Sequence, residues 1–404
     1  MRRAIYEVDA PTKPKPGEVL LQHGLAKQAL PFLKKEFQED DFRSWVNMGA
    51  CLRTLGRLDE AKEHVKKAIE LNQRCENAWY NLALLMEDYG EFEHAREAIE
   101  IAHKILPVEK EIAIHYATIN MRLGNWEAVR DAFEFGREEF YWYSFKGIPI
   151  WRGELLDGKR LLVVHEGGYG DFFWLMRYFK LLKEQGCHVT YLAWKKQKEF
   201  AQKLCPWIDC VLAADEFLDT NDYDFQCGHW SLLSLWDGPL CMTEPYVVPA
   251  KLAIDKANFT VGISWQAEEM GMARKFRSIP MKDLAPLQNI PVNWTALNIS
   301  KRIPTWCSDP REVLNRGWVD TASVIDRCDL VITIDTANAH LAGAMGKPTW
   351  LLLPKNSFWQ WGTEEDSFVE QWYPSVRPFW NHDILRWDKL IEEVKLACGS
   401  LNIP

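Results

Sequence analysis

The sequence predicts an arm of helical repeats followed by two α/β lobes, and three observations support this fold class. Residues recur at a period of 34 in the first third of the chain. An apolar run, a glycine-rich loop and a helical pattern follow one another over 160–182, and a second apolar run passes into a small-residue helix over 330–344. Because 404 residues exceed one ordinary hydrophobic core, two or three domains are expected.

Composition and charge narrow the classes of function. Hydrophobic residues make up 47% of the chain and charged residues 26%, which is typical of a folded soluble protein. The net charge of −9 argues against a surface built mainly to bind phosphate backbones or anionic lipid. No apolar run approaches the ~20 residues that span a bilayer. The charged, proline-rich segment 1–17 does not have the pattern of a secretory signal, so the cytoplasm is expected. The ten cysteines lack metal-type spacing, which predicts buried thiols.

The helical arm is predicted from large, small and glycine residues that recur every 34 positions: Trp45 and Trp79; Gly56, Gly90 and Gly124; Ala61 and Ala95; Ala68 and Ala102. This period predicts two antiparallel helices per repeat. The alanines let the helices approach closely, and the glycine ends the first helix in a left-handed turn. The repeats are expected over 17–140, after a tail at 1–16 and with a capping helical pair around 25–37.

The repeat pattern resembles the tetratricopeptide repeat. Trp45-x-x-Met48-Gly49-x-x-Leu52 carries the resemblance, 79–107 matches better still, and the third copy is degenerate. Two roles stay open for such repeats. They either extend the protein or mediate its self-association, or they present a protein partner or an acceptor on a concave face.

Two α/β lobes are predicted, the first over 147–255 and the second over 256–404. In the first lobe, the run Arg160–His165 ends in a glycine loop and a helix, which is the opening of a doubly wound Rossmann-like sheet. Further strands are predicted at 188–194, 210–213 and 223–227 in the first lobe, and at 260–265, 292–297, 330–334 and 349–353 in the second. An amphipathic helix around 387–394 closes the chain. Ligands in such sheets bind at the carboxyl ends of the strands.

Three motifs resemble the bacterial heptosyltransferase family, and the repeat-fused members of that family in particular. They are Gly170-Asp171 before an apolar helix, Arg277-Ser278-Ile279-Pro280, and Asp335-Thr336-x-x-Ala339-His340-Leu341-Ala342-Gly343. The resemblance covers about 147–400 and implies the GT-B fold, in which two Rossmann-like lobes face a cleft. The first loop reads Gly168-Tyr169-Gly170-Asp171 where the family often has Gly-Leu-Gly-Asp, and the basic loop 266–278 is longer and richer in Met and Glu.

The resemblance implies an inverting, metal-independent transfer of a sugar from a nucleotide-diphosphate sugar to an acceptor hydroxyl. Asp171 would be the catalytic base, and the alternative is a carboxylate that caps the following helix. The nucleotide sugar is a substrate, so no cofactor is expected. No Asp-x-Asp motif stands near the predicted site, and no metal is expected.

The donor diphosphate is expected to bind Lys275, Arg277 and Ser278, together with backbone N–H groups of the helix opened by Thr336 and Ala337. By resemblance, Asp335 would accept a hydrogen bond from a sugar or ribose hydroxyl, and its alternative is a helix cap. His340 is either a donor contact or a structural histidine. Contacts to the acceptor or cleft are assigned to His165, Glu166, Gly168, Tyr169, Gly170 and Trp265.

A protein or glycan acceptor suits the repeats and the acidic charge balance. A hydroxymethylated DNA base is the first alternative, and it would need to leave the base stack and meet a basic stripe. Residues that could form such a stripe are Lys195, Lys196, Lys198, Arg274, Lys275 and Lys301. The second alternative is a non-catalytic repeat scaffold with a degenerate transferase domain.

Overall fold

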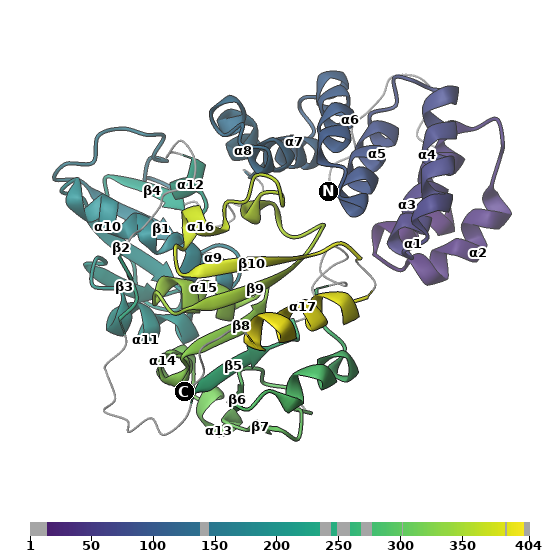
Figure 1. The fold of residues 1–404 in the computed structure, drawn as a ribbon. Helices are drawn as coiled ribbons and strands as arrows, with labels where there is room; N and C mark the ends of the chain where they lie inside the picture. Colours follow the sequence, from purple (N-terminus) through teal and green to yellow (C-terminus); the bar gives the residue numbers. More distant parts are fainter. Residues whose placement is uncertain are drawn as a thin grey trace. The chain divides into compact units, whose positions relative to one another are not determined.

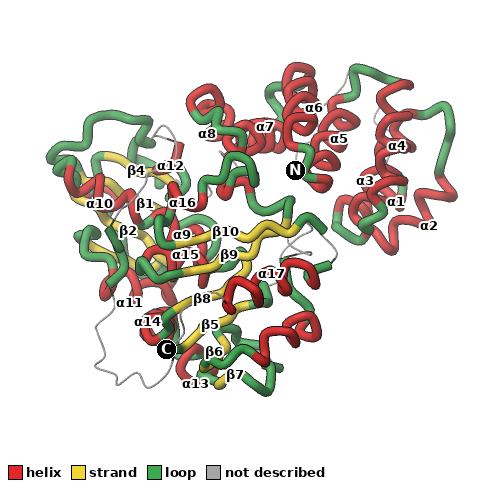
Figure 2. Tube along the Cα trace, viewed as in Figure 1, coloured by secondary structure: helices red, strands yellow, loops and turns green. Residues whose placement is uncertain are grey.

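The structure is a computed structural model that describes residues 14–137, 145–234, 244–248, 259–267, 277–300, 302–383 and 386–399. The chain divides into two compact units, Met1–Glu139 and Phe140–Pro404. The first unit is helical and the second contains two sheets (Figures 1 and 2). None of the described helices has both the length and the apolar character that crossing a membrane requires.

The helical unit is a series of antiparallel helix pairs: α1 (Pro16–Gln22) and α2 (Ala26–Glu36), α3 (Phe42–Thr54) and α4 (Leu58–Leu71), α5 (Glu76–Tyr89) and α6 (Phe92–Ile105), α7 (Lys110–Arg122) and α8 (Arg130–Arg137). Gly56, Gly90 and Gly124 have φ angles of 77°, 69° and 83° in the turns inside the last three pairs. The 34-residue period predicted these left-handed turns, where a glycine lacks the Cβ that disfavours positive φ.

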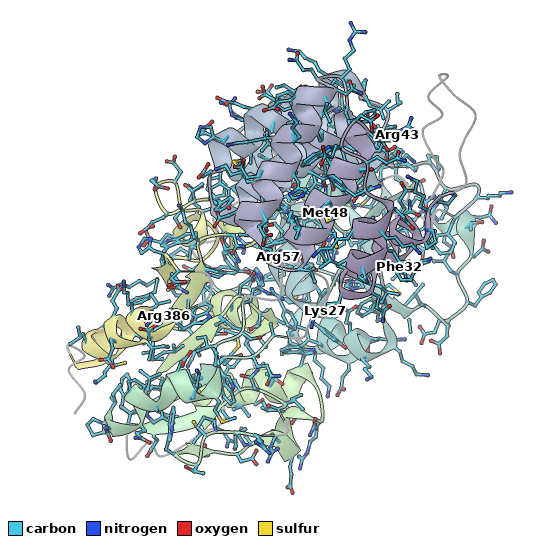
Figure 3. The ribbon with its side chains drawn as sticks, turned by 90° about the vertical axis from the view of Figure 1, so that its right-hand side faces the viewer. Lys27, Phe32, Arg43, Met48, Arg57 and Arg386 are labelled. Atoms are coloured by element: carbon cyan, nitrogen blue, oxygen red, sulfur yellow. The ribbon has the colours of Figure 1, made fainter. Side chains whose placement is uncertain are left out.

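Small residues set the distance between the helices of a pair. Ala61 and Ala95 are fully buried, and a Cβ added to Gly49 would lie 2.7 Å from Cγ2 of Val65. Met48 is buried among the helices, whereas Lys27 and Arg43 project from their surface (Figure 3). The periodic small residues therefore form the packed interior of each repeat, as the sequence predicts.

The second unit contains two parallel sheets, one in each lobe. The first has the order β3-β2-β1-β4 and the second the order β10-β9-β8-β5-β6-β7. The strands are β1 (Arg160–Val164), β2 (His188–Ala193), β3 (Cys210–Ala213), β4 (Phe225–Gly228), β5 (Thr260–Ser264), β6 (Asn293–Ala296), β7 (Cys307–Ser308), β8 (Leu330–Ile334), β9 (Thr349–Pro354) and β10 (Val376–Asn381). All residues of β8 and β9 are buried, as expected for strands covered on both faces.

The helices of this unit are α9 (Tyr169–Leu175), α10 (Arg177–Glu184), α11 (Lys195–Leu204), α12 (Ser231–Ser234), α13 (Arg311–Leu314), α14 (Trp318–Arg327), α15 (Ala337–Ala344), α16 (Val369–Trp372) and α17 (Asp388–Gly399). α17, the closing helix, packs its apolar face into the core of the second lobe through Leu390, Ile391 and Val394. α9 of the first lobe lies side by side with α15 of the second (Figure 1). The connections that follow β1 and β8 therefore meet.

Candidate functional site

The connection from β1 to α9 carries the candidate base. Gly167 and Gly168 are exposed, and Gly167 has a φ of 78°. The backbone N–H of Gly168 donates to Oδ2 of Asp171 over 2.6 Å, so this carboxylate caps its own helix. A Cβ at Gly167 would lie 2.4 Å from the same oxygen, which requires glycine there. A carboxylate has about four acceptor positions, so capping and proton acceptance can coexist on Asp171.

Glu166 and Trp230 complete this connection. Glu166 is 8% exposed, and its Oε2 accepts a hydrogen bond from the backbone N–H of Trp230 over 3.1 Å. Its carboxylate occupies the space where a side chain at Gly228 would begin. Nε1 of Trp230 lies 2.9 Å from the position of a Cβ on Gly167, beside the Asp171 carboxylate. Sequence reasoning missed Trp230, although it follows a predicted strand at the carboxyl edge of the sheet.

His165 is held inside the first lobe. It is 2% exposed, and burial lowers its pKa to about 4. Oε1 of Gln197 accepts from the backbone N–H of Trp194, which directs the Gln197 amide nitrogen to Nε2 of His165 at 3.1 Å. Nε2 also lies 3.2 Å from the Gly167 carbonyl, and Nδ1 lies 2.6 Å from the Tyr191 hydroxyl. His165 is therefore neutral at pH 7 and occupied by protein partners.

Tyr169 lies where the lobes meet. Its ring centroid is 6.2 Å from that of Trp194 in the first lobe and 5.1 Å from that of Trp318 in the second. The residue is half-buried and lies beside the exposed glycines of the loop. Tyr169 therefore combines an interlobe packing role with the position assigned to it as an acceptor contact.

The second lobe holds an ion pair at the end of β8. Nη1 of Arg277 donates to the Asp335 carbonyl over 2.9 Å and to Asp335 Oδ2 over 3.2 Å, with side-chain exposures of 13% and 5%. Among the described residues, Nε of Arg277 is buried without a hydrogen-bond partner. Ser278 Oγ accepts from the backbone N–H of Ala267 over 3.0 Å. Lys275, the other basic residue assigned to the donor, lies outside the described residues.

The N-terminus of α15 begins directly after this ion pair. Thr336 is the N-cap residue, but its hydroxyl makes no capping bond to the described helix. It instead contacts the Ile334 carbonyl at 3.4 Å and the Thr333 hydroxyl at 3.3 Å. Ala337, the first residue of α15, is half-buried. The side chain of Thr336 therefore leaves the first-turn N–H groups of α15 without its cap.

His340 is buried one turn into α15. Its Nδ1 is 2.9 Å from the Tyr373 hydroxyl and its Nε2 is 2.8 Å from the Gln360 amide nitrogen. Its ring stacks on Trp361 with centroids 4.8 Å apart, and burial lowers its pKa to about 3. This is the structural alternative for His340: a neutral imidazole with a partner at each nitrogen.

Two of the motifs singled out in the sequence touch each other. A Cβ on Gly170 would lie 3.1 Å from Cδ2 of His340 and 3.7 Å from the Cα of Ala337. Gly170 therefore sits against the first turn of α15, and Asp171 is the next residue in the chain. The structure thus brings the motif that contains the candidate base against the first turn of α15, the helix that follows the Arg277–Asp335 pair.

Other assigned or considered residues lie elsewhere. Trp265 is 2% exposed, and its side chain belongs to the core of the second lobe. Lys195 pairs with Asp215 at 3.2 Å and Lys198 pairs with Glu216 at 2.5 Å, so acidic partners offset two of the lysines considered for a basic stripe. Within the described ranges, no group of three His, Cys, Asp or Glu side chains is arranged to hold a metal ion.

Comparisons with known proteins find similarity in both units of the chain to different extents. The tetratricopeptide repeat family model matches residues 42–75. Together with the 34-residue helix pairs, this match identifies tetratricopeptide repeats in the first unit. Protein FlbA of Caulobacter vibrioides (strain ATCC 19089 / CIP 103742 / CB 15) is 23% identical over 87% of this chain, which spans 66% of the length of that protein.

Solved structures similar to parts of the chain are of two kinds. MamA is 22% identical, covers 31% of this chain and 74% of its own, and has a TM-score of 0.27. A glycosyl transferase family 9 protein from Veillonella parvula DSM 2008 is 11% identical over 61% of this chain and 91% of its own, with a TM-score of 0.39. The iron-containing dodecameric glycosyltransferase TibC from enterotoxigenic E. coli H10407 is 13% identical over 49% of this chain and 59% of its own, with a TM-score of 0.36.

Proposed function

We propose that the second unit is a glycosyltransferase that moves a sugar from a nucleotide-diphosphate sugar to an acceptor hydroxyl, with inversion and without a metal ion. The observation that carries the proposal is the contact of Gly170 with Ala337 and His340. Asp171 is the next residue after Gly170, so this contact supports a carboxylate of one lobe acting near a helix N-terminus of the other. A sugar between the two would face a proton acceptor on one side and anion-binding groups on the other.

The donor diphosphate binds at the start of α15 in this proposal. Its negative oxygens would accept hydrogen bonds from the first-turn N–H groups, which the Thr336 hydroxyl does not cap. The buried Nε of Arg277, unpartnered among the described residues, supports the assignment because an unsatisfied buried donor costs free energy that a phosphate oxygen would recover. Charge grows on the diphosphate as it leaves, so fixed donors there stabilise the transition state. Lys275 remains a further predicted donor contact.

Asp171 is the general base of the proposed reaction. Its carboxylate removes the proton of the acceptor hydroxyl as that oxygen bonds to the anomeric carbon. The bond from the anomeric carbon to the diphosphate oxygen breaks on the opposite face, and the electron pair leaves with the nucleoside diphosphate. One displacement inverts the configuration, and the proton ends on Asp171. The acceptor is a protein or glycan, because Lys195 and Lys198 are offset by acidic partners and tetratricopeptide repeats suit a macromolecular partner.

Ligand binding and turnover test the proposal. UDP-, GDP-, ADP- and dTDP-linked sugars are screened for a rise in melting temperature, since a ligand that binds the folded protein stabilises it. Release of nucleoside diphosphate from the best donor, and mass spectrometry of the product, then measure transfer. Asp171→Asn is expected to lower kcat roughly 100- to 10,000-fold, the usual contribution of a general base. An amide oxygen can still accept from Gly168, so the helix cap is retained.

Glu216→Gln is the matched control, because it makes the same carboxylate-to-amide change at an ion pair elsewhere in the first lobe. It should leave turnover unchanged. Equal turnover in wild type and Asp171→Asn would reject the base. If no nucleotide sugar raises the melting temperature, the transferase proposal fails and the non-catalytic repeat scaffold is preferred.

A further inference from the structure

The guanidinium of Arg177 is buried where the two lobes meet. Arg177 is the first residue of α10 and is fully buried. Its Nε donates to the Trp174 carbonyl over 2.8 Å in the first lobe, and its Nη1 donates to the Trp372 carbonyl over 2.9 Å in the second. Its Nη2 donates to the Tyr246 hydroxyl over 3.1 Å. One side chain thus donates hydrogen bonds to three segments that lie far apart in the sequence.

The carbonyls of Trp174 and Trp372 both lie at the C-terminal end of a helix, which explains why a cation is placed beside them. Trp174 lies in the last turn of α9, and Trp372 is the last residue of α16. Terminal carbonyls of a helix have no partner within the helix and carry partial negative charge, so a cation stabilises them. Aromatic rings complete the surroundings, with the guanidinium carbon 4.9 Å from the ring centroid of Trp372 and 4.7 Å from that of Tyr373.

Tyr246 ties the segment between the lobes to the same point. Its hydroxyl donates to the Phe173 carbonyl of α9 over 2.9 Å. The backbone N–H groups of Tyr246 and Val247 both donate to the Ala344 carbonyl at the end of α15, over 3.0 and 3.1 Å. This short segment therefore bonds α9 with its side chain and α15 with its backbone.

Tyr373 extends the contacts of Arg177 to the proposed donor site. Its ring lies against Gly343 of α15, where an added Cβ would be 2.5 Å from the ring. Its hydroxyl is 2.9 Å from Nδ1 of His340, whose ring edge meets Gly170. The position of α15 against α9 thus depends on a continuous set of contacts that begins at Arg177.

We infer that Arg177 is a positioning residue, which fastens α15 to α9 and so sets the distance from Asp171 to the donor. The effect of Arg177 on catalysis rests on the proposed function. The fastening of the two helices rests on hydrogen bonds alone. Arg177 touches neither substrate nor the reacting atoms. It acts through α9, whose first turn holds Asp171, and through Tyr373, which holds α15. Loss of the guanidinium would let the two helices separate without removing any group from the site.

Hydrogen exchange tests the fastening without reference to activity. In Arg177→Met, the amides of Tyr246 and Val247 are expected to exchange roughly ten- to hundredfold faster, the effect of losing a hydrogen bond to a charged group. Amides of β1 and β8 should stay protected, which shows that each lobe remains folded. Arg177→Lys keeps the charge but loses the planar fork of donors, so a smaller acceleration is expected. Tyr246→Phe removes one hydroxyl and should also accelerate exchange.

Turnover of the best nucleotide-sugar donor tests the positioning. Arg177→Lys is expected to lower kcat about 100-fold, a loss that a displacement of about 1 Å can cause, with KM for the donor changed far less. Arg122→Lys is the matched control. Arg122 is also a buried arginine against an aromatic ring, 4.2 Å from the Phe92 centroid, but it belongs to the helical unit. It should leave kcat and the exchange of Tyr246 unchanged.

The outcomes separate the two proposals. Unchanged exchange of Tyr246 and Val247 in Arg177→Met, with both lobes folded, overturns the fastening. Faster exchange with unchanged kcat in Arg177→Lys overturns the positioning role. If the wild-type protein neither binds nor turns over any nucleotide sugar, the proposed function is rejected. Accelerated exchange in Arg177→Met would still establish the fastening in that case.

Discussion

The connections that follow β1 and β8 share one topology and differ in chemistry. Each leads from a buried parallel strand to a short helix at the carboxyl edge of its sheet. After β1, the loop is exposed and Asp171 caps its own helix. After β8, Asp335 is buried against Arg277, and Thr336 turns its hydroxyl away from the helix that it begins.

The difference teaches how one fold supplies two kinds of group. Asp171 accepts the N–H of Gly168 and places a negative charge in the first turn of α9, so the start of α9 suits an acidic side chain and repels a phosphate. The uncapped start of α15, with a guanidinium beside it, suits the reverse. The two connections touch through Gly170 and His340, so the Asp171 loop and the helix start proposed to bind the anion are neighbours.

The largest stability effect should come from removing the cation of the β8 connection. Arg277→Met leaves the Asp335 carboxylate, 5% exposed, without its partner. Breaking a buried ion pair on one side costs about 3–5 kcal/mol. The free energy of unfolding of the α/β unit, measured in urea, should fall by this amount. Asp335→Asn in the same background should recover part of the loss, because it removes the charge left buried.

A loss below about 1 kcal/mol in Arg277→Met, the range of exposed pairs, would show that the pair is solvated. The contrast between a buried charge in the β8 connection and an exposed glycine loop in the β1 connection would then disappear.

Gly170→Ala should have the next largest effect on the free energy of unfolding, because it disrupts the contact between the two connections. The added Cβ would lie 3.1 Å from Cδ2 of a His340 ring that partners hold at both nitrogens. Overpacking of this kind costs about 1–3 kcal/mol. Gly168→Ala is the matched control, since Gly168 is exposed, has a φ of −100° and would place its Cβ 3.5 Å from Asp171. Equal melting temperatures for the two variants would contradict close contact at Gly170.

Acidification should weaken both connections through their buried histidines. Burial lowers the pKa of His165 to about 4 and of His340 to about 3, from 6.5 in an unfolded chain. Below pH 6.5 the unfolded chain binds protons that the folded protein excludes. Burying the two histidines in their neutral form therefore carries no pH-dependent cost above pH 6.5. The free energy of unfolding decreases as the pH falls below that value. Each histidine should contribute a slope of up to about 1.4 kcal/mol per pH unit, which is largest near pH 5.

Urea unfolding at several pH values measures this slope, and His340→Gln should reduce it by one histidine's share. An unchanged slope in that variant would mean that His340 is protonated in the folded state. In the same variant the remaining pH dependence from buried histidines comes from His165. It therefore measures the β1 connection separately from the β8 connection.

Local patterns predicted most of the fold. The bounds of β3 and β8 are those expected at 210–213 and 330–334. β10 escaped prediction because Pro378 interrupts its pattern, and a proline is tolerated there because β10 is an edge strand paired only with β9 among the described strands.

The site was only partly predictable, because its decisive contacts join distant positions. Arg177 and Trp372 are 195 residues apart, and no local spacing could reveal their hydrogen bond. The sequence also left both roles of Asp171 open, since a cap and a base need the same residue at the start of a helix. The structure shows the capping hydrogen bond of Asp171 directly. Whether Asp171 is also the general base is a question for turnover measurements on Asp171→Asn.

The smallest expected effect concerns Thr336, the residue that occupies the N-cap position of α15. Replacing a capping Thr by Ala usually costs about 0.5–2 kcal/mol, because the first N–H groups lose an acceptor. Here the hydroxyl bonds the Ile334 carbonyl instead, so Thr336→Ala should lower the free energy of unfolding by less than about 0.5 kcal/mol. Asp41→Ala is the matched control, since Asp41 accepts from the N–H of Arg43 at the start of α3 and truly caps that helix. A loss in Thr336→Ala as large as the loss in Asp41→Ala would mean that the hydroxyl caps α15 in solution. The start of α15 would then be as closed to an anion as the start of α9, and the chemical difference between the two connections would vanish.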